Sequence, residues 1–214
     1  MTLKKAGLII FLILLADQIL KVYIKLNFAL NESIQVFGFD WFRIYFVENE
    51  GAAWGAQIPW EHGKVVLSLF RLLIAPVIGY WLVKSVREHA PKLLIISISL
   101  IFAGALGNII DSLFYGVIFS ASENGGPIAT FLPEAGGYAK PLYGKVVDMF
   151  YFPIIENAIL PNWIPVWGGK SFTFFNAIFN IADMAISTGV GILLVFNKRV
   201  FPKTEKDQAP TEVA

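Results

Sequence analysis

The chain has 214 residues, of which 56% are hydrophobic and only 15% are charged, and its formal net charge is +1. Soluble proteins contain about 25% charged residues on average, so this composition indicates an integral membrane protein. A net charge so close to zero excludes a nucleic-acid-binding surface that depends on bulk charge. The absence of cysteine excludes disulfides, thiol nucleophiles and cysteine-ligated metals, and two histidines are too few for a histidine-rich metal site.

Four apolar stretches are each long enough to cross the hydrocarbon core of a bilayer, which takes about 20 helical residues. They cover residues 6–24, 65–83, 93–119 and 178–196, and we predict a transmembrane helix in each. The first stretch has the length of a signal peptide, but no small-residue cleavage site follows it. We therefore predict that it is retained as a helix.

The distribution of basic residues orients these helices. Nine lie in the short segments at the two ends of the chain and between the second and third helices, and six lie in the much longer connections 25–64 and 120–177. The positive-inside rule then places both termini in the cytoplasm and both long connections outside it. Residues 1–201 are predicted to form one membrane domain, and residues 202–214 a polar, disordered cytoplasmic tail.

The two long connections carry structural signals of their own. Residues 34–47 are rich in β-branched and aromatic residues around Gly38, which predicts a short β-hairpin. Residues 120–140 are rich in glycine and polar residues, which predicts a flexible excursion. Trp163 and Trp167 lie among prolines in the segment before the fourth helix, a composition typical of a membrane–water interface.

Polar residues inside membrane helices are costly and therefore mark candidate sites. Asn108 and Asp111 are spaced i, i+3 and share one face of the third predicted helix, and Asn180 and Asp183 repeat this spacing in the fourth. At about 1.5 Å of rise per residue, both pairs lie within the outer leaflet. The two polar faces are therefore predicted to meet at one level.

Asp148 is a third acidic residue of interest, because it lies in an apolar run that returns from the second long connection toward the membrane. Its apolar neighbours are expected to desolvate it, and desolvation raises the pKa of a carboxylic acid. If Asp148 meets Asp183, repulsion makes the two carboxyls share one proton. Such a pair supplies both a general base for water and an acid near neutral pH, with no metal or organic cofactor.

Each of these residues also has a purely structural interpretation. Asn108 and Asn180 can join helices by hydrogen bonds, and Asp17 can pair with the lysine four residues after it. Asp111 can hold helix ends or loops together, and Asp148 can be a solvated loop acid.

Two other classes of function fit a small helical membrane protein with buried carboxylates. A proton-coupled transporter or channel uses intramembrane acids, but it would place polar groups along the whole depth of the membrane, whereas here they gather toward the outer side. No inverted repeat typical of transporters is visible in the sequence. A scaffold or assembly factor would need no ionisable Asp148 or Asp183.

Five segments with polar or glycine-rich motifs follow one another from the first to the fourth predicted helix. They are Asp17-Gln18, Asn49–Gly55 (NEGAAWG), Gly104–Asp111 (GALGNIID), Val146–Phe150 (VVDMF) and Phe179–Ile186 (FNIADMAI). Their sequence and order resemble the bacterial lipoprotein signal peptidases, also called signal peptidase II.

This resemblance implies an all-α membrane protein with four transmembrane helices, a small extracytoplasmic β-cradle and a second extracytoplasmic excursion. It further implies an aspartic endopeptidase of the bacterial inner membrane, expected as a monomer, with its active site toward the outer leaflet. The implied substrates are diacylglyceryl-modified prolipoproteins, cut just before the lipidated cysteine. Membrane lipid is an implied partner, and globomycin-type cyclic peptides are implied inhibitors.

The resemblance also assigns roles to single residues. Asp148 and Asp183 correspond to the catalytic dyad, and Asp17 to a structural residue. Five further residues correspond to positions that bind substrate or support the dyad: Asn49, Gly51, Asn108, Asp111 and Asn180.

The sequence departs from the family pattern at Ser112, because the family usually has an arginine directly after the aspartate of the third motif. Arg43 and Lys145 are the two cations that we consider as replacements for that arginine. The outer excursions 120–140 and 151–170 are also long for the family, so they are expected to cap the site differently.

Overall fold

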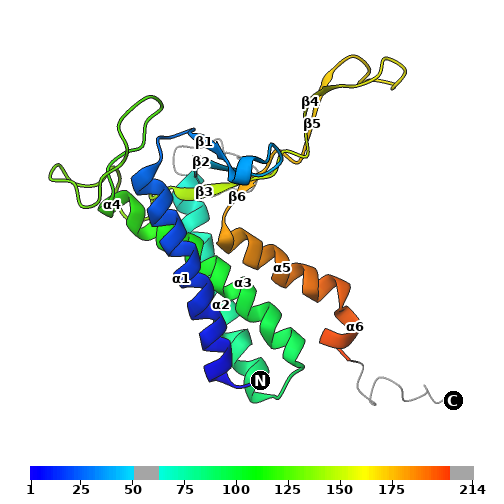
Figure 1. The fold of residues 1–214 in the computed structure, drawn as a ribbon. Helices are drawn as coiled ribbons and strands as arrows, with labels where there is room; N and C mark the ends of the chain where they lie inside the picture. The colour runs from blue at the N-terminus through cyan, green and yellow to red at the C-terminus, as the bar shows by residue number, and fades with distance from the viewer. Residues whose placement is uncertain (51–62, 203–214) are drawn as a thin grey trace. The chain divides into compact units, whose positions relative to one another are not determined.

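The structure is a computed structural model that describes residues 1–50 and 63–202. Three of the described helices are long and apolar enough to cross a membrane: α1 (Leu3–Asn27), α2 (Gly63–Arg87) and the helical run Lys92–Ile118 (Figure 1). The first three predicted spans are thus confirmed as long apolar helices. The helix α5 (Ile181–Val195) is apolar but has only 15 residues, and the short α6 (Asn197–Val200) follows it.

The third helical run changes its hydrogen-bonding pattern near its C-terminal end. It begins as the α-helix α3 (Lys92–Ile110), continues through the π-helical segment η3 (Asp111–Tyr115) and ends in one further turn, α4 (Gly116–Ile118). The predicted boundary at residue 119 is therefore close. Segments of π-helix inside α-helices are rare and often occur at functional sites.

A four-stranded antiparallel sheet forms from segments that are far apart in the sequence. Its order is β1 (Ser33–Gln35), β2 (Arg43–Asn49), β3 (Val146–Tyr151) and β6 (Ile178–Phe179). The 3₁₀ turn η1 (Val36–Gly38) lies between β1 and β2, so the predicted hairpin is confirmed.

The pairing of β6 corrects the predicted start of the fourth helix. We predicted a helix from residue 178, but Ile178 and Phe179 pair with Tyr151 and Phe150 of β3, and α5 begins only at Ile181. Hydropathy fails here because a short apolar strand and the first turn of an apolar helix have the same composition.

A second, two-stranded sheet consists of β4 (Ile155–Ile159) and β5 (Ser171–Phe174). Figure 1 shows this hairpin projecting away from the four-stranded sheet. Trp163 and Trp167 lie in the loop that joins its strands, and both are largely exposed.

By the density of its internal contacts the chain divides into two compact units. The first consists of Met1–Ala16, Arg71–Gly107 and the chain from Ile181 onward. Its buried side chains are mostly aliphatic, and they include Leu82, Ile95 and Ile98. Within this unit α3 and α5 pack backbone to backbone, because a Cβ atom on Gly104 would lie 2.2 Å from the carbonyl oxygen of Ala182. The glycine of the third motif is therefore needed for close helix packing.

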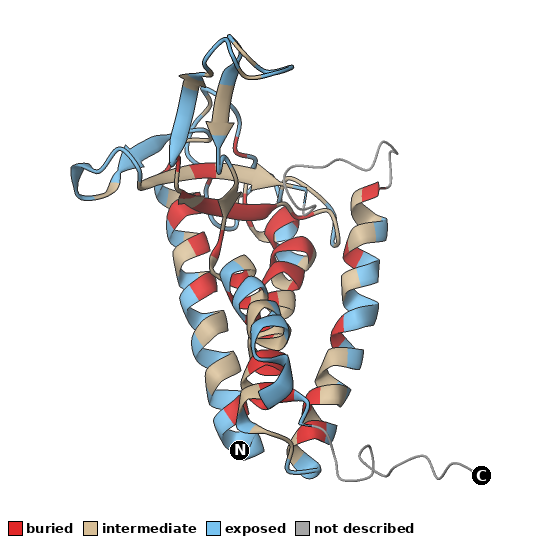
Figure 2. Ribbon diagram, turned by 90° about the vertical axis from the view of Figure 1, so that its right-hand side faces the viewer, coloured by how far each residue is buried: buried red, intermediate tan, exposed pale blue. Residues whose placement is uncertain are grey.

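The second unit consists of Asp17–Phe70 and Asn108–Asn180, and it contains the four-stranded sheet. Its core is partly aromatic, and Figure 2 shows that buried residues are concentrated in β3. The fully buried members of this core come from α1, β2, β3 and the end of the third helical run: Ile24, Phe46, Tyr115, Phe119, Val147 and Met149.

The excursion predicted to be flexible, residues 120–140, is folded onto the end of the third helical run. The backbone amide of Tyr138 donates to the carbonyl of Phe119 at 3.1 Å, and that of Ala139 donates to the carbonyl of Gly116 at 2.8 Å. A Cβ atom on Gly137 would lie 2.2 Å from the carbonyl oxygen of Gly116. Gly137 is therefore needed for this close packing of the excursion on the helix end.

Candidate active site

A fully buried lysine, Lys21, lies in the C-terminal half of α1 and joins three polar residues. Its Nζ atom lies 2.9 Å from Asp17 Oδ2 and 2.8 Å from Asp111 Oδ2, and it donates a 3.0 Å hydrogen bond to Asn108 Oδ1. The ammonium group lies within ion-pair distance of both buried carboxyl groups, and its one positive charge balances one negative charge. The predicted pairing of Asp17 with Lys21 is confirmed, and so is the shared face of Asn108 and Asp111, since both contact the same ammonium group.

Gln18 connects the two carboxylates around Lys21. Its Nε2 atom donates to Asp111 Oδ1 at 2.9 Å and to Asp17 Oδ2 at 3.1 Å, and its Oε1 atom accepts from the hydroxyl of Tyr115 at 3.2 Å. Asp111 and Tyr115 are the first and last residues of η3, so the π-helical segment presents both side chains to α1. These contacts favour a bracing role for Asp111.

A line of hydrogen bonds leads from Asn108 to Asp148. Asn180 Nδ2 donates to Asn108 Oδ1 at 3.3 Å, to the carbonyl of Val147 at 3.4 Å and to Asp148 Oδ1 at 2.6 Å. Lys21 and Asn180 thus both donate to Asn108 Oδ1, which orients the Asn108 amide. The four residues joined in this way are each at most 3% exposed: Lys21, Asn108, Asn180 and Asp148.

Asp148 lies in the middle of β3, opposite Val47 of β2, and it is 2% exposed. Its second oxygen, Oδ2, accepts a 3.2 Å hydrogen bond from Asn49 Nδ2. Each oxygen of Asp148 therefore receives an amide donor, and such donors stabilise the ionised form of a carboxylate. The structure thus rules out the alternative in which Asp148 is a solvated loop acid.

Asp183 lies in the first turn of α5 and is half-buried. It follows Asn180 by three residues, and Asn180 immediately precedes the helix rather than belonging to it, contrary to our prediction. Asp148 belongs to the second compact unit and Asp183 to the first. Their pairing in a dyad stays a prediction. Gly51, the remaining candidate, lies outside the described residues.

The position of the family arginine is occupied by a serine that contacts its own helix. Ser112 Oγ donates to the carbonyl of Asn108 at 3.0 Å. The two cations considered as replacements contact other carboxylates: Arg43 lies 3.3 Å from Glu156, and Lys145 lies 3.6 Å from Glu48.

The main feature that sequence reasoning missed is the reach of Lys21 and Gln18 to the third helical run. We predicted for Lys21 only a local partner, Asp17. The available signal was the cost of placing a lysine in an apolar membrane helix. This cost favours contacts between the lysine and buried acids of neighbouring helices.

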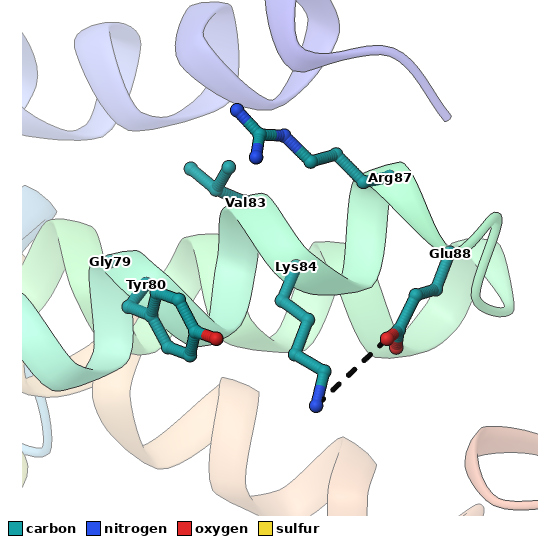
Figure 3. Close-up of a pocket in the computed structure, with 6 residues that line it drawn as sticks. All are labelled: Gly79, Tyr80, Val83, Lys84, Arg87 and Glu88. Carbon is teal, nitrogen blue, oxygen red and sulfur yellow. Dashed lines mark ion pairs between the residues drawn. The ribbon is translucent and has the colours of Figure 1, made fainter.

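A surface pocket of about 500 Å³ occurs in the first unit and contains none of the predicted site residues. Six residues of α2 and its C-terminal end line it: Gly79, Tyr80, Val83, Lys84, Arg87 and Glu88. Figure 3 shows that Lys84 and Glu88 extend from the same side of the helix, where they form an exposed ion pair of 3.9 Å.

Comparison with known proteins supports the resemblance found in the sequence. Residues 9–198 match the family model described as Signal peptidase (SPase) II. The lipoprotein signal peptidase of Porphyromonas gingivalis is 43% identical over 98% of this chain and 94% of its own length. That of Amoebophilus asiaticus is 31% identical over 96% of this chain and 82% of its own length.

Solved structures show a similar fold. A bacterial membrane enzyme solved by the in meso method at 2.3 Å resolution superposes with a TM-score of 0.59 and is 22% identical in sequence. The match covers 99% of this chain and 95% of the chain of that enzyme. A second such enzyme, solved at 1.9 Å resolution, gives a TM-score of 0.56 over 91% and 93% of the two chains at 25% identity.

Proposed function

Because the chain belongs to the signal peptidase II family, we propose that it is a membrane-bound lipoprotein signal peptidase. Its substrates in this proposal are prolipoproteins whose lipobox cysteine already carries diacylglycerol. The enzyme cuts the peptide bond just before that cysteine and releases the signal peptide.

The proposed catalytic pair is Asp148 and Asp183. The observation that carries this assignment is the 2.6 Å hydrogen bond from Asn180 to Asp148, which joins β3 to the residue directly before α5. Asp183 lies in the first turn of that helix. Asn49, Asn108 and Asn180 act in this proposal as supports of the dyad.

The contacts of Asp148 suggest how the two acids divide the chemistry. Asp148 receives one amide donor on each oxygen, which orients its carboxyl group, and we assign it as the general base that takes a proton from the attacking water. Asp183 then holds the shared proton and donates a hydrogen bond to the carbonyl oxygen of the scissile bond. When the tetrahedral intermediate collapses, Asp148 gives the proton that it took from water to the leaving amine, which returns the pair to its starting state.

Lys21, Asp17 and Asp111 connect α1 to the third helical run, next to the hydrogen bonds that lead to Asp148. Removing one member of a buried ion cluster leaves an uncompensated charge, which costs about 3–5 kcal/mol. Their proposed role is therefore to hold Asn108 in the orientation in which it accepts from Asn180.

The proposed enzyme crosses the bacterial inner membrane four times, with α5 as the fourth and shortest span. Both termini, including the tail 202–214, lie in the cytoplasm, and the dyad lies toward the outer leaflet. The basic residues of the short segments support this orientation. We expect a single peptidase domain that works as a monomer among membrane lipids and is inhibited by globomycin-type cyclic peptides.

Cleavage of a purified prolipoprotein tests this function directly. We expect the purified protein to cut the diacylglyceryl-modified substrate and to leave the unmodified precursor intact. Asp148→Asn and Asp183→Asn should each abolish cleavage, because an amide can neither accept the proton of water nor hold the shared proton. Lys84→Gln, in an exposed ion pair outside the site, is the control and should cleave normally.

Two results would contradict the proposal. Substantial turnover by either aspartate variant would remove that residue from the chemistry. Equal cleavage of modified and unmodified precursor would show that the lipid is not part of what the enzyme recognises.

A further inference from the structure

A second ionic cluster lies beside Asp148 and consists of the buried Lys25 and Glu48 and the partly exposed Lys145. Lys25 is in the last turns of α1 and its side chain is fully buried, and the Glu48 side chain on β2 is 3% exposed. Lys25 Nζ forms an ion pair and hydrogen bond with Glu48 Oε1, and Lys145 Nζ lies 3.6 Å from Glu48 Oε2. One carboxylate is therefore shared by two cations from two different elements.

The 120–140 excursion completes this cluster. Lys25 Nζ donates a 2.8 Å hydrogen bond to Ser122 Oγ and lies 4.9 Å from the centre of the Tyr138 ring. The Tyr138 hydroxyl in turn accepts a 2.6 Å hydrogen bond from the backbone amide of Lys145. Burial raises the pKa of Tyr138, so the hydroxyl stays neutral while it accepts this hydrogen bond. The excursion thus encloses Lys25 and holds Lys145, the residue directly before β3.

The cluster lies next to the proposed catalytic strand pair. Glu48 is directly before Asn49 on β2 and opposite Val147 of β3, while Val47 is opposite Asp148. Because side chains alternate along a strand, Glu48 points to one face of the sheet and Asn49 to the other, where Asn49 contacts Asp148. Anchoring Glu48 therefore fixes the direction of Asn49.

The register of this strand pair needs such an anchor. It is irregular between Ile44 and Val47, so the regular ladder at Arg43 and Ile44 does not by itself set the pairing of the next residues. A slip by one residue would turn Asn49 to the opposite face and away from Asp148.

We propose that Glu48 is a positioning residue for peptide cleavage: held by Lys25, Lys145 and the 120–140 excursion, it keeps Asn49 on Asp148. This inference rests on the proposed function, because it assigns Asp148 a role in the reaction. The outer excursion is then a brace of the catalytic strand, since two of its side chains close the cluster around Lys25.

A double-mutant cycle tests the route through Asn49. Glu48→Gln keeps the shape of the side chain but removes its charge, and we expect it to lower kcat about tenfold with little change in KM. Asn49→Ala removes the contact that Glu48 is proposed to maintain. In the Asn49→Ala background, Glu48→Gln should therefore cause no further loss of kcat. Equal fractional losses of kcat in both backgrounds would overturn the proposal, because a general loss of structure acts independently of Asn49.

Conservative and control variants separate positioning from folding. Lys25→Arg keeps the cation and should retain most of the activity, whereas Lys25→Met should behave as Glu48→Gln does, including its dependence on Asn49. Lys84→Gln with Glu88→Gln removes an exposed ion pair and should change nothing. If Glu48→Gln does not fold, Lys25→Met with Glu48→Leu replaces the buried pair by apolar side chains, which proteins often tolerate. This double variant is then combined with Asn49→Ala in the same cycle. Equal fractional losses of kcat in both backgrounds would again overturn the proposal.

The same assay distinguishes failure of this inference from failure of the proposed function. If the unaltered protein does not cut the lipid-modified precursor, or if Asp148→Asn cuts it, the proposed function fails. If both behave as expected and the cycle is additive, only the positioning role of Glu48 fails.

Discussion

Substitution of Asn180 is the most informative perturbation of the candidate site. Asn180→Ala removes a side-chain amide that donates to Asn108, to the Val147 carbonyl and to Asp148. Both ends of its shortest hydrogen bond are buried, with Asn180 at 0% and Asp148 at 2% exposure, so bulk solvent does not surround the position of the lost donor.

The size of the effect follows from the type of hydrogen bond. A hydrogen bond to a charged group contributes about 1.5–3 kcal/mol. If that loss appears wholly in the transition state, kcat falls roughly 10- to 150-fold, since about 1.4 kcal/mol corresponds to a factor of ten. Asn180→Asp should be worse, because it places a second carboxyl against Asp148 and removes the donor.

The assay is single-substrate kinetics on a fluorogenic lipidated prolipopeptide, with the melting temperature of each variant measured in the same detergent. We expect kcat in the order unaltered protein, Asn180→Ala, Asn180→Asp, with KM changing less than kcat. A folded Asn180→Ala variant whose kcat is within twofold of the unaltered protein would refute the reasoning. In that case the hydrogen bond at 2.6 Å would have no part in the chemical step.

Three further predictions test the cluster, the dyad and the topology. Lys21→Met should lower the free energy of unfolding by about 3–5 kcal/mol. The melting temperature should then fall by roughly 6–20 °C. An unchanged melting temperature would show that the buried acids need no cation. Cleavage should fall on both the acid and the alkaline side of its pH optimum, because only the singly protonated pair is competent, and it should survive a strong chelator; loss of activity on chelation that zinc restores would contradict a metal-free dyad. In intact cells a cysteine at position 123 should react with an impermeant thiol reagent and one at position 204 should not, and cysteines at 148 and 183 together should accept a short crosslinker. The reverse labelling pattern would invert the proposed topology, and failure of the crosslink in folded protein would leave the dyad without support.

Sequence patterns were most successful where one physical rule acts alone. The length of apolar runs located the first three long helices. Helical periodicity placed Asn108 and Asp111 on one face, and the spacing of Asp17 and Lys21 predicted their ion pair. Aromatic and β-branched composition predicted the β1–β2 hairpin.

The predictions failed where long-range partners decide the local structure. Ile178 and Phe179 form a strand because β3 offers them an edge, which no local pattern encodes. The 120–140 excursion is ordered because Ser122 and Tyr138 close around a lysine about a hundred residues earlier in the chain. For the same reason the sequence did not reveal the cluster around Glu48, whose members are unremarkable one by one.

The π-helical segment η3 has a consequence for how sequences of relatives are aligned. A π-turn holds one residue more than an α-turn, so it shifts the phase of every side chain that follows. Asn108, which lies in α3, and Asp111, the first residue of η3, contact Lys21. Tyr115, the last residue of η3, and Phe119, which follows α4, are buried in the aromatic core. Deletion of either Leu113 or Phe114 would restore a regular α-helix. It would also rotate the aromatic rings that follow by about 100° around the helix axis. A relative that keeps both the polar contacts and the buried rings is therefore expected to have no gap within this segment.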